Sequence, residues 1–157
     1  MSQESDHDAS KSVLDVPSAA DVRGRMAERE QEKLAEAARK QRQEDEHQKS
    51  VMESLRRPLA APPEEIVRHL TPLVRAAAER GATEVVVYRF PNALCTDRGR
   101  AINNGEPGWE QTLTGQPRSA FEFWRDHLRD KGYKLSAEIL EFPDGMPGDV
   151  GFILSWK

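Results

Sequence analysis

Aromatic residues are missing from the first half of this 157-residue chain. All ten of them lie between Tyr88 and Trp156, and residues 1–87 contain none. A segment without large apolar side chains buries too little surface to offset the entropy lost on folding. We therefore expect no independent core in the N-terminal part and place the folded domain at residues 58–157. A domain of this size can fold without a disulfide or a structural metal.

Cysteine and long apolar runs are also scarce. Cys95 is the single cysteine, which excludes an intramolecular disulfide framework and fits a reducing compartment. The first twelve residues lack the basic flank and apolar run of a signal peptide. No apolar run approaches the roughly 20 residues needed to cross a bilayer. The sequence therefore predicts a soluble, cytoplasmic protein that has no membrane partner.

An excess of positive charge is absent as well. The formal net charge is −4, with 13 acids and 11 bases in residues 1–57 and 14 acids and 12 bases in residues 58–157. Neither part is basic, so a broad electrostatic grip on nucleic acid is disfavoured, although a local basic patch is compatible with these numbers.

The N-terminal part divides into a tail and a charged arm. Residues 1–20 are polar, and we expect them to be disordered. Residues 21–57 are mostly good helix formers, with Ser18 or Asp21 as the expected cap. No apolar residue occurs between Arg39 and Ser50, so no coiled-coil seam is sustained. Two interpretations stay open: a solvated charged helix, or a helix that binds a protein partner. The partner-binding side chains would be Met26, Leu34, Val51 and Leu55.

Proline marks the start of the expected domain, and a helix follows. From Pro63 to about Arg80, a stripe of apolar residues recurs at helical spacing. Pro72 falls inside this pattern, so either the helix kinks or Thr71 caps a second helix.

Three strands are expected, at 83–90, 133–142 and 150–156, and the last two should form an antiparallel hairpin. The first strand carries apolar residues on both faces, which favours a position inside the sheet. A short helix capped by Asn92 is expected across 92–104, and an amphipathic helix from about Pro117 to Gly132. This order predicts an α+β fold, a two-layer domain with a small, mostly antiparallel sheet of about three strands covered by helices.

The segment from Tyr88 to Trp109 holds the densest collection of special residue types. Cys95 could act as a nucleophile if a histidine or an electropositive setting stabilised its thiolate, and His69 and His127 are the histidines of the expected domain. The alternative is a small buried apolar residue, since free cysteine is among the most often buried types.

Polar residues follow Cys95 and form a second candidate group, with Asp97, Arg98, Arg100, Asn103 and Asn104. Two arginines around a glycine could clamp a phosphate or carboxylate. The alternative is local ion pairing and helix termination. Trp109 is either an exposed interface anchor or a lid that folds back on the core. Tyr88 and Phe90 could stack on RNA bases only if they lay on an open sheet face.

No spacing typical of a metal site or a nucleotide-binding loop occurs, so we expect neither a metal nor a cofactor. The candidate residues also lack a complete catalytic set. We therefore expect a non-enzymatic interaction or adaptor module, in which the arm recruits a protein partner and residues 88–109 form a recognition surface. One alternative is a protein or enzyme that binds an anionic small molecule through Arg98, Arg100 and Cys95. Another is a nucleic-acid-binding accessory protein.

Overall fold

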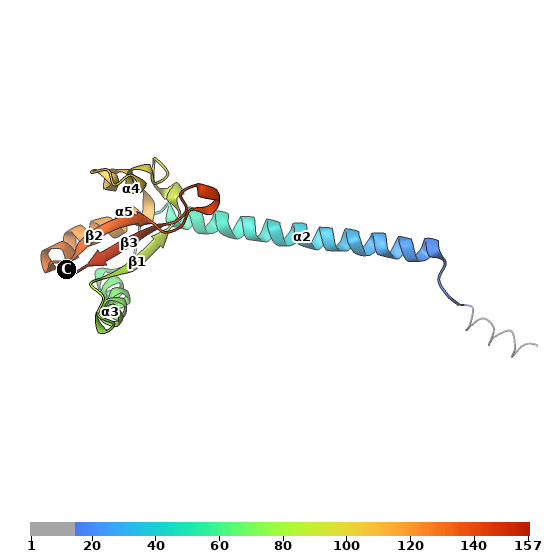
Figure 1. The fold of residues 1–157 in the computed structure, drawn as a ribbon, viewed down its shortest axis with the longest axis horizontal. Coiled ribbons are helices and arrows are strands. Elements are labelled where there is room, and N and C mark those ends of the chain that lie inside the picture. Colours follow the sequence, from blue (N-terminus) through green and yellow to red (C-terminus); the bar gives the residue numbers. More distant parts are fainter. Residues whose placement is uncertain (1–14) are drawn as a thin grey trace, which may run out of the picture. The chain divides into compact units, whose positions relative to one another are not determined.

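The computed structural model describes residues 15–157 (Figure 1). The predicted disordered tail therefore lies mostly outside the described residues. The chain divides into two units, residues 1–49 and residues 50–157, and each is treated separately below.

Helix α2 spans Ala19–Leu55. Ser18 is its N-terminal cap, because the Ser18 hydroxyl oxygen accepts a hydrogen bond of 3.1 Å from the backbone N–H of Asp21. Every residue of α2 in the first unit is exposed. The last turns belong to the second unit, where Met52 and Leu55 pack against the hydrophobic core. The compact unit thus includes the end of the helix that the sequence analysis assigned to the arm.

The core of the second unit is built on a sheet of three antiparallel strands in the order β1-β3-β2. Strand β1 spans Glu84–Phe90, β2 spans Lys134–Ile139 and β3 spans Val150–Ser155. The predicted α+β fold and the predicted hairpin of the last two strands are confirmed. One face carries three apolar cross-strand rows: Val85–Leu154–Leu135, Tyr88–Phe152–Ala137 and Phe90–Val150–Ile139.

The prediction that the first strand lies inside the sheet is wrong. β1 is an edge strand, and β3 is the central one. A β-bulge between Val86 and Tyr88 shifts the register of β1. The extra residue returns Tyr88 to the face already occupied by Val87, so consecutive apolar residues share one face. The apolar pattern on both predicted faces therefore reflects the bulge and does not indicate burial on two sides.

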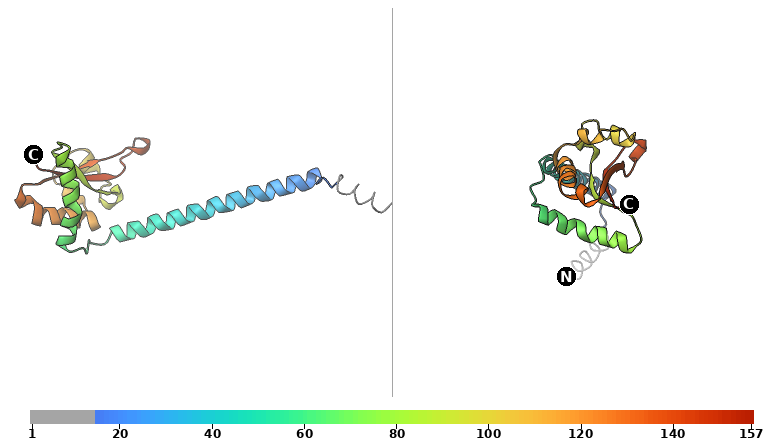
Figure 2. Two further views of the ribbon diagram at one scale, coloured as in Figure 1. Left: turned by 90° about the horizontal axis from the view of Figure 1, so that it is seen from below. Right: turned by 90° about the vertical axis from the view of Figure 1, so that its left-hand side faces the viewer.

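Two helices, α3 and α5, lie against the apolar face of the sheet (Figure 2). Helix α3 spans Pro63–Glu79 and continues through Pro72, so Thr71 does not begin a second helix. The Thr71 hydroxyl instead donates to the Val67 carbonyl at 2.8 Å. Helix α5 spans Gly115–Phe123 and continues as a π-helix over Trp124–Leu128 and a 3₁₀ turn over Arg129–Lys131. Gly132, with φ of 94°, ends it as expected.

The expected helix over 92–104 is broken into two short pieces. A 3₁₀ turn covers Asn92–Leu94, and helix α4 covers only Arg100–Asn103. Between them Gly99 adopts φ of 84°, a left-handed conformation that interrupts any continuous helix. Asn92 does not cap a helix, because its side-chain amide donates to the Pro147 carbonyl. A second 3₁₀ turn, η2, spans Trp109–Thr112.

Candidate functional site

Cys95 lies in the hydrophobic core with Leu94, Ile102 and Leu113. Its backbone is extended and forms an isolated bridge with Leu113. Burial raises the pKa of the thiol above its ordinary value, and the Asp97 carboxylate raises this pKa further, against a lowering hydrogen bond from Thr112. A buried thiol with a raised pKa is protonated at neutral pH and is a poor nucleophile.

The polar residues after Cys95 form a tight turn. One carboxylate oxygen of Asp97 accepts from the Gly99 N–H at 3.0 Å, and the other accepts from the Ala101 N–H at 2.9 Å. Asp97 therefore holds the turn that leads into α4. Arg98, between Asp97 and Gly99 in this turn, has φ of 58°, in the left-handed region that residues other than glycine rarely adopt.

The remaining candidates divide between the surface and the core. The side chains at the surface are Arg98, Arg100, Asn103 and Asn104. Trp109 is half-buried, with its ring 5.9 Å from that of Phe121 and 6.0 Å from that of Phe152. Cys95 and the two arginines, which the anionic-ligand alternative combines, are thus split between interior and exterior. Tyr88 and Phe90 lie on the helix-covered face of the sheet, away from its open face.

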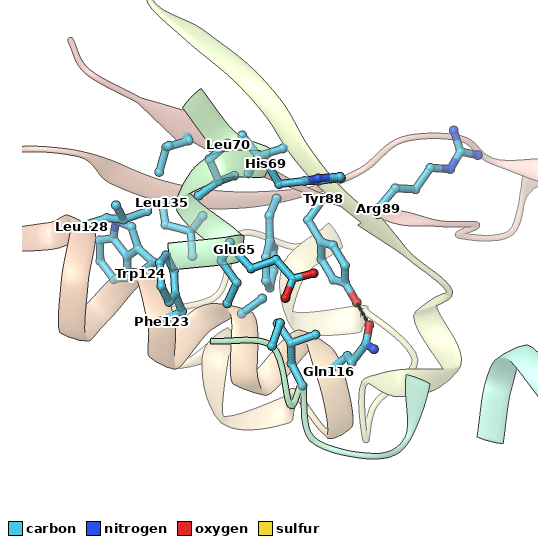
Figure 3. A pocket seen from close by; sticks show the side chains of 17 residues that line it. Glu65, His69, Leu70, Tyr88, Arg89, Gln116, Phe123, Trp124, Leu128 and Leu135 are labelled. Carbon is cyan, nitrogen blue, oxygen red and sulfur yellow. Dashed lines mark hydrogen bonds between the residues drawn. The ribbon is translucent and has the colours of Figure 1, made fainter. Parts of the chain in front are cut away.

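The structure brings together a second set of residues that the sequence analysis did not single out as a site. A groove of about 460 Å³ lies between α3, the apolar face of the sheet and α5 with its π-helical continuation (Figure 3). Its floor includes Val87 and Phe152, and its two walls include Leu70 of α3 and Trp124 of the π-helix. The Trp124 ring is held in place, since its indole N–H donates to the Tyr133 carbonyl at 2.9 Å.

Polar groups gather at one end of this groove. The Tyr88 hydroxyl donates to the side-chain carbonyl of Gln116 at 3.1 Å, which ties β1 to the start of α5 (Figure 3). Desolvation by burial raises the pKa of Tyr88 from 10.0 to about 12. The phenol therefore stays neutral at neutral pH and remains a hydrogen-bond donor. Glu65 and His69 of α3 also line this part of the groove.

The charges around the groove are not balanced. The Arg89 guanidinium is occupied by two carboxylates, with 3.0 Å to Glu141 and 2.7 Å to Asp149. Glu65 takes part in no ion pair within residues 15–157. Its side chain extends from α3 toward the side of the groove where Tyr88 and Gln116 lie (Figure 3). The groove therefore carries one unmatched carboxylate at its polar end.

The sequence contained one signal of this groove. Ile66 and Leu70 belong to the apolar stripe predicted for the helix after Pro63, and both are only partly buried. The stripe identified the face of the helix, but it could not show that part of this face lines a groove.

Residues 15–157 contain no group of three or more His, Cys, Asp or Glu side chains placed to hold a metal ion. Among the same residues, no helix is both long and apolar enough to span a bilayer.

Comparison with known proteins adds no assignment. No protein-family model, curated protein or solved structure matches this chain.

Proposed function

We propose that this protein is a non-enzymatic interaction module, in which helix α2 binds the apolar groove of a partner protein. The observation that supports this proposal is the exposure of large apolar side chains on a charged helix. Met26 and Leu34 are 65% and 64% exposed, and Val22 is 43% exposed. A partner that buried one of these side chains completely would gain about 1.5–3 kcal/mol of binding free energy from it.

The spacing of these residues suits recognition of one helical face. At about 100° per residue, Val22, Met26 and Leu34 fall within about 120° of one another around the helix axis. Binding of a helix in a groove uses such anchors on one face, while charged residues remain at the rim. Between Ala19 and Lys49 the helix has eight acidic and eight basic residues, so its charge does not favour a strongly charged partner surface.

The second unit contributes a further surface to this proposal. The exposed side chains after Cys95, which are Arg98, Arg100, Asn103 and Asn104, would act as an additional recognition surface. Their guanidinium and amide groups offer directed hydrogen bonds to a partner. The burial of Cys95 supports a non-enzymatic role, because it withdraws the only thiol from the surface.

The test compares two double variants of the full chain. Met26→Asp/Leu34→Asp places two carboxylates on the proposed binding face. Ala35→Asp/Gln43→Asp adds the same two charges on the opposite side of the helix. Partners are first captured by crosslinking in the native host, and each identified protein is then titrated in purified form by calorimetry. Circular dichroism verifies that both variants keep the helical content of the unchanged chain.

The proposal predicts at least a tenfold loss of affinity for the first variant and little change for the second, since central apolar anchors dominate such interfaces. A captured partner that binds both variants equally well would refute the role of α2. Capture of no protein at all would refute the interaction function itself.

A further inference from the structure

We infer that the groove between α3, the sheet and α5 is a binding site for a small amphiphile with an apolar body and a cationic head group. This inference is independent of the function proposed for α2, because it concerns only residues of the second unit. It rests on the size of the groove, its lining and the charge at its polar end.

The size of the groove fits a small molecule. Its volume of about 460 Å³ lies in the range of typical ligand pockets, roughly 300–1,000 Å³. It is a concave site bounded by two helices and a sheet, whereas a partner protein usually requires a broad surface. A molecule of about ten carbon atoms with one polar group is therefore a suitable probe.

The lining fits an apolar body. Leu70 and Leu135 lie at the end of the groove away from Gln116, together with Trp124 and Leu128 (Figure 3). Leu70, Trp124 and Leu135 keep part of their surface exposed to solvent, so an alkyl chain that displaces the water gains about 0.8 kcal/mol for each buried methylene. That gain corresponds to about a fourfold increase in affinity per methylene.

The charge at the polar end selects the head group. The carboxylate of Glu65 has no ion-pair partner among the described residues, while the guanidinium of Arg89 is already paired with Glu141 and Asp149. An amine at this end would meet Glu65, and it could also donate to Gln116 Oε1, which within residues 15–157 accepts a hydrogen bond from the Tyr88 hydroxyl alone. A carboxylate head group would meet the negative charge of Glu65, and Arg89, the one arginine that lines the groove within residues 15–157, is already held by two carboxylates.

The experiment titrates the full chain with three probes of equal length, decylamine, decanol and decanoate, each below the concentration at which it forms micelles or separates from solution. Amide and indole N–H signals are followed by two-dimensional NMR at low salt. We expect shifts at Leu70, Ala120 and the Trp124 indole, and none across Arg98–Asn104. We expect decylamine to bind about three- to fivefold more tightly than decanol, the upper range for an exposed ion pair, and decanoate to bind most weakly.

Two single variants on the same helical turn isolate the head-group contact. Glu65→Gln removes the carboxylate that lines the groove, and Glu64→Gln removes its neighbour, which is equally classed as exposed but does not line the groove. Glu65→Gln should bring the decylamine-to-decanol affinity ratio close to one. Glu64→Gln should preserve the ratio, because Glu64 does not line the groove. Both variants lose one negative charge, so a difference between them reports the direct contact with Glu65. A series from octylamine to decylamine should show the fourfold increase per methylene.

Three outcomes would overturn the inference. If none of the probes shifts the groove signals, the groove does not bind an amphiphile. If decanoate binds as tightly as decylamine, the head-group selectivity is wrong. If Glu64→Gln and Glu65→Gln lower the ratio equally, the amine responds to the overall charge of the helix end and does not contact Glu65.

Discussion

Replacing Gly115 by alanine tests how the end of α2 packs on the folded unit. Gly115 begins α5 with φ of 57°, and a Cβ at this position would lie 2.8 Å from the Cα of Arg56 and 2.9 Å from its carbonyl carbon. Both atoms belong to the backbone, so relief requires the chain after Leu55 to move. Gly105 is a matched control, because it has φ of 64° and its Cβ would meet nothing within 4 Å.

The two substitutions share the cost of the left-handed backbone but differ in the clash. Gly105→Ala should lower the free energy of unfolding by about 1–2 kcal/mol through backbone strain alone. Gly115→Ala carries the same strain and adds about 1–3 kcal/mol for overpacking, which gives about 2–5 kcal/mol in total. Against a typical stability of 5–15 kcal/mol, the variant should still fold.

The assay is urea unfolding followed by tryptophan fluorescence, with both variants measured at the same temperature and salt concentration. A Gly115→Ala variant no less stable than Gly105→Ala would show that α2 does not approach α5 as closely as the structure places it. A second measurement checks the mechanism. If the clash displaces the end of α2, Leu55→Ala should cost less in the Gly115→Ala background than in the unchanged chain, because neighbouring sites are not additive.

Three further predictions concern other parts of the chain. Iodoacetamide should modify Cys95 at least about 100-fold faster in urea-unfolded protein than in native protein at neutral pH, because burial withdraws the thiol and raises its pKa. Leu55→Ala should lower the free energy of unfolding by about 1–3 kcal/mol, whereas the exposed Met26→Ala should change it by less than about 0.5 kcal/mol. Tyr88 has a pKa of about 12 in the folded protein and an ordinary value of 10.0. The unfolded chain therefore ionises this phenol first, and the contribution of neutral Tyr88 to the free energy of unfolding, fully present below pH 10, should be lost as the pH rises to 12. After discounting for its partial exposure, the loss should be about 1–2 kcal/mol in alkaline unfolding curves, and Tyr88→Phe should remove most of it.

The strands could be predicted because their apolar residues alternate strongly and turn residues bound them. Tyr133 to Ile139 alternates apolar and polar residues, and the PDGMPGD segment separates it from the apolar run of β3. The position of β1 could not be predicted in the same way. A bulge adds one residue to a strand, and its effect on side-chain direction imitates a strand buried on both faces.

The candidate site was harder to predict, because a sequence pattern indicates which chemical groups are present but not whether each side chain points to the core or to the surface. The unusual residues between Cys95 and Trp109 stand close together in the sequence, yet the turn held by Asp97 sends Cys95 to the core and Arg98 to the surface. The groove combines residues from α3, β1 and α5, which are distant in the sequence. Their proximity depends on the packing of helices on the sheet, and no local pattern records it.

The incomplete burial of α3 explains why the groove exists. Ala77, near the C-terminal end of the helix, is fully buried, and it is the only buried residue among the 17 of α3. Ile66 and Leu70, nearer the N-terminal end, share its apolar stripe but keep part of their surface exposed and line the groove. The stripe is therefore longer than the part of the helix that the core buries. A ligand that fills the groove would complete this burial, and binding to the folded state alone would stabilise the unit by mass action.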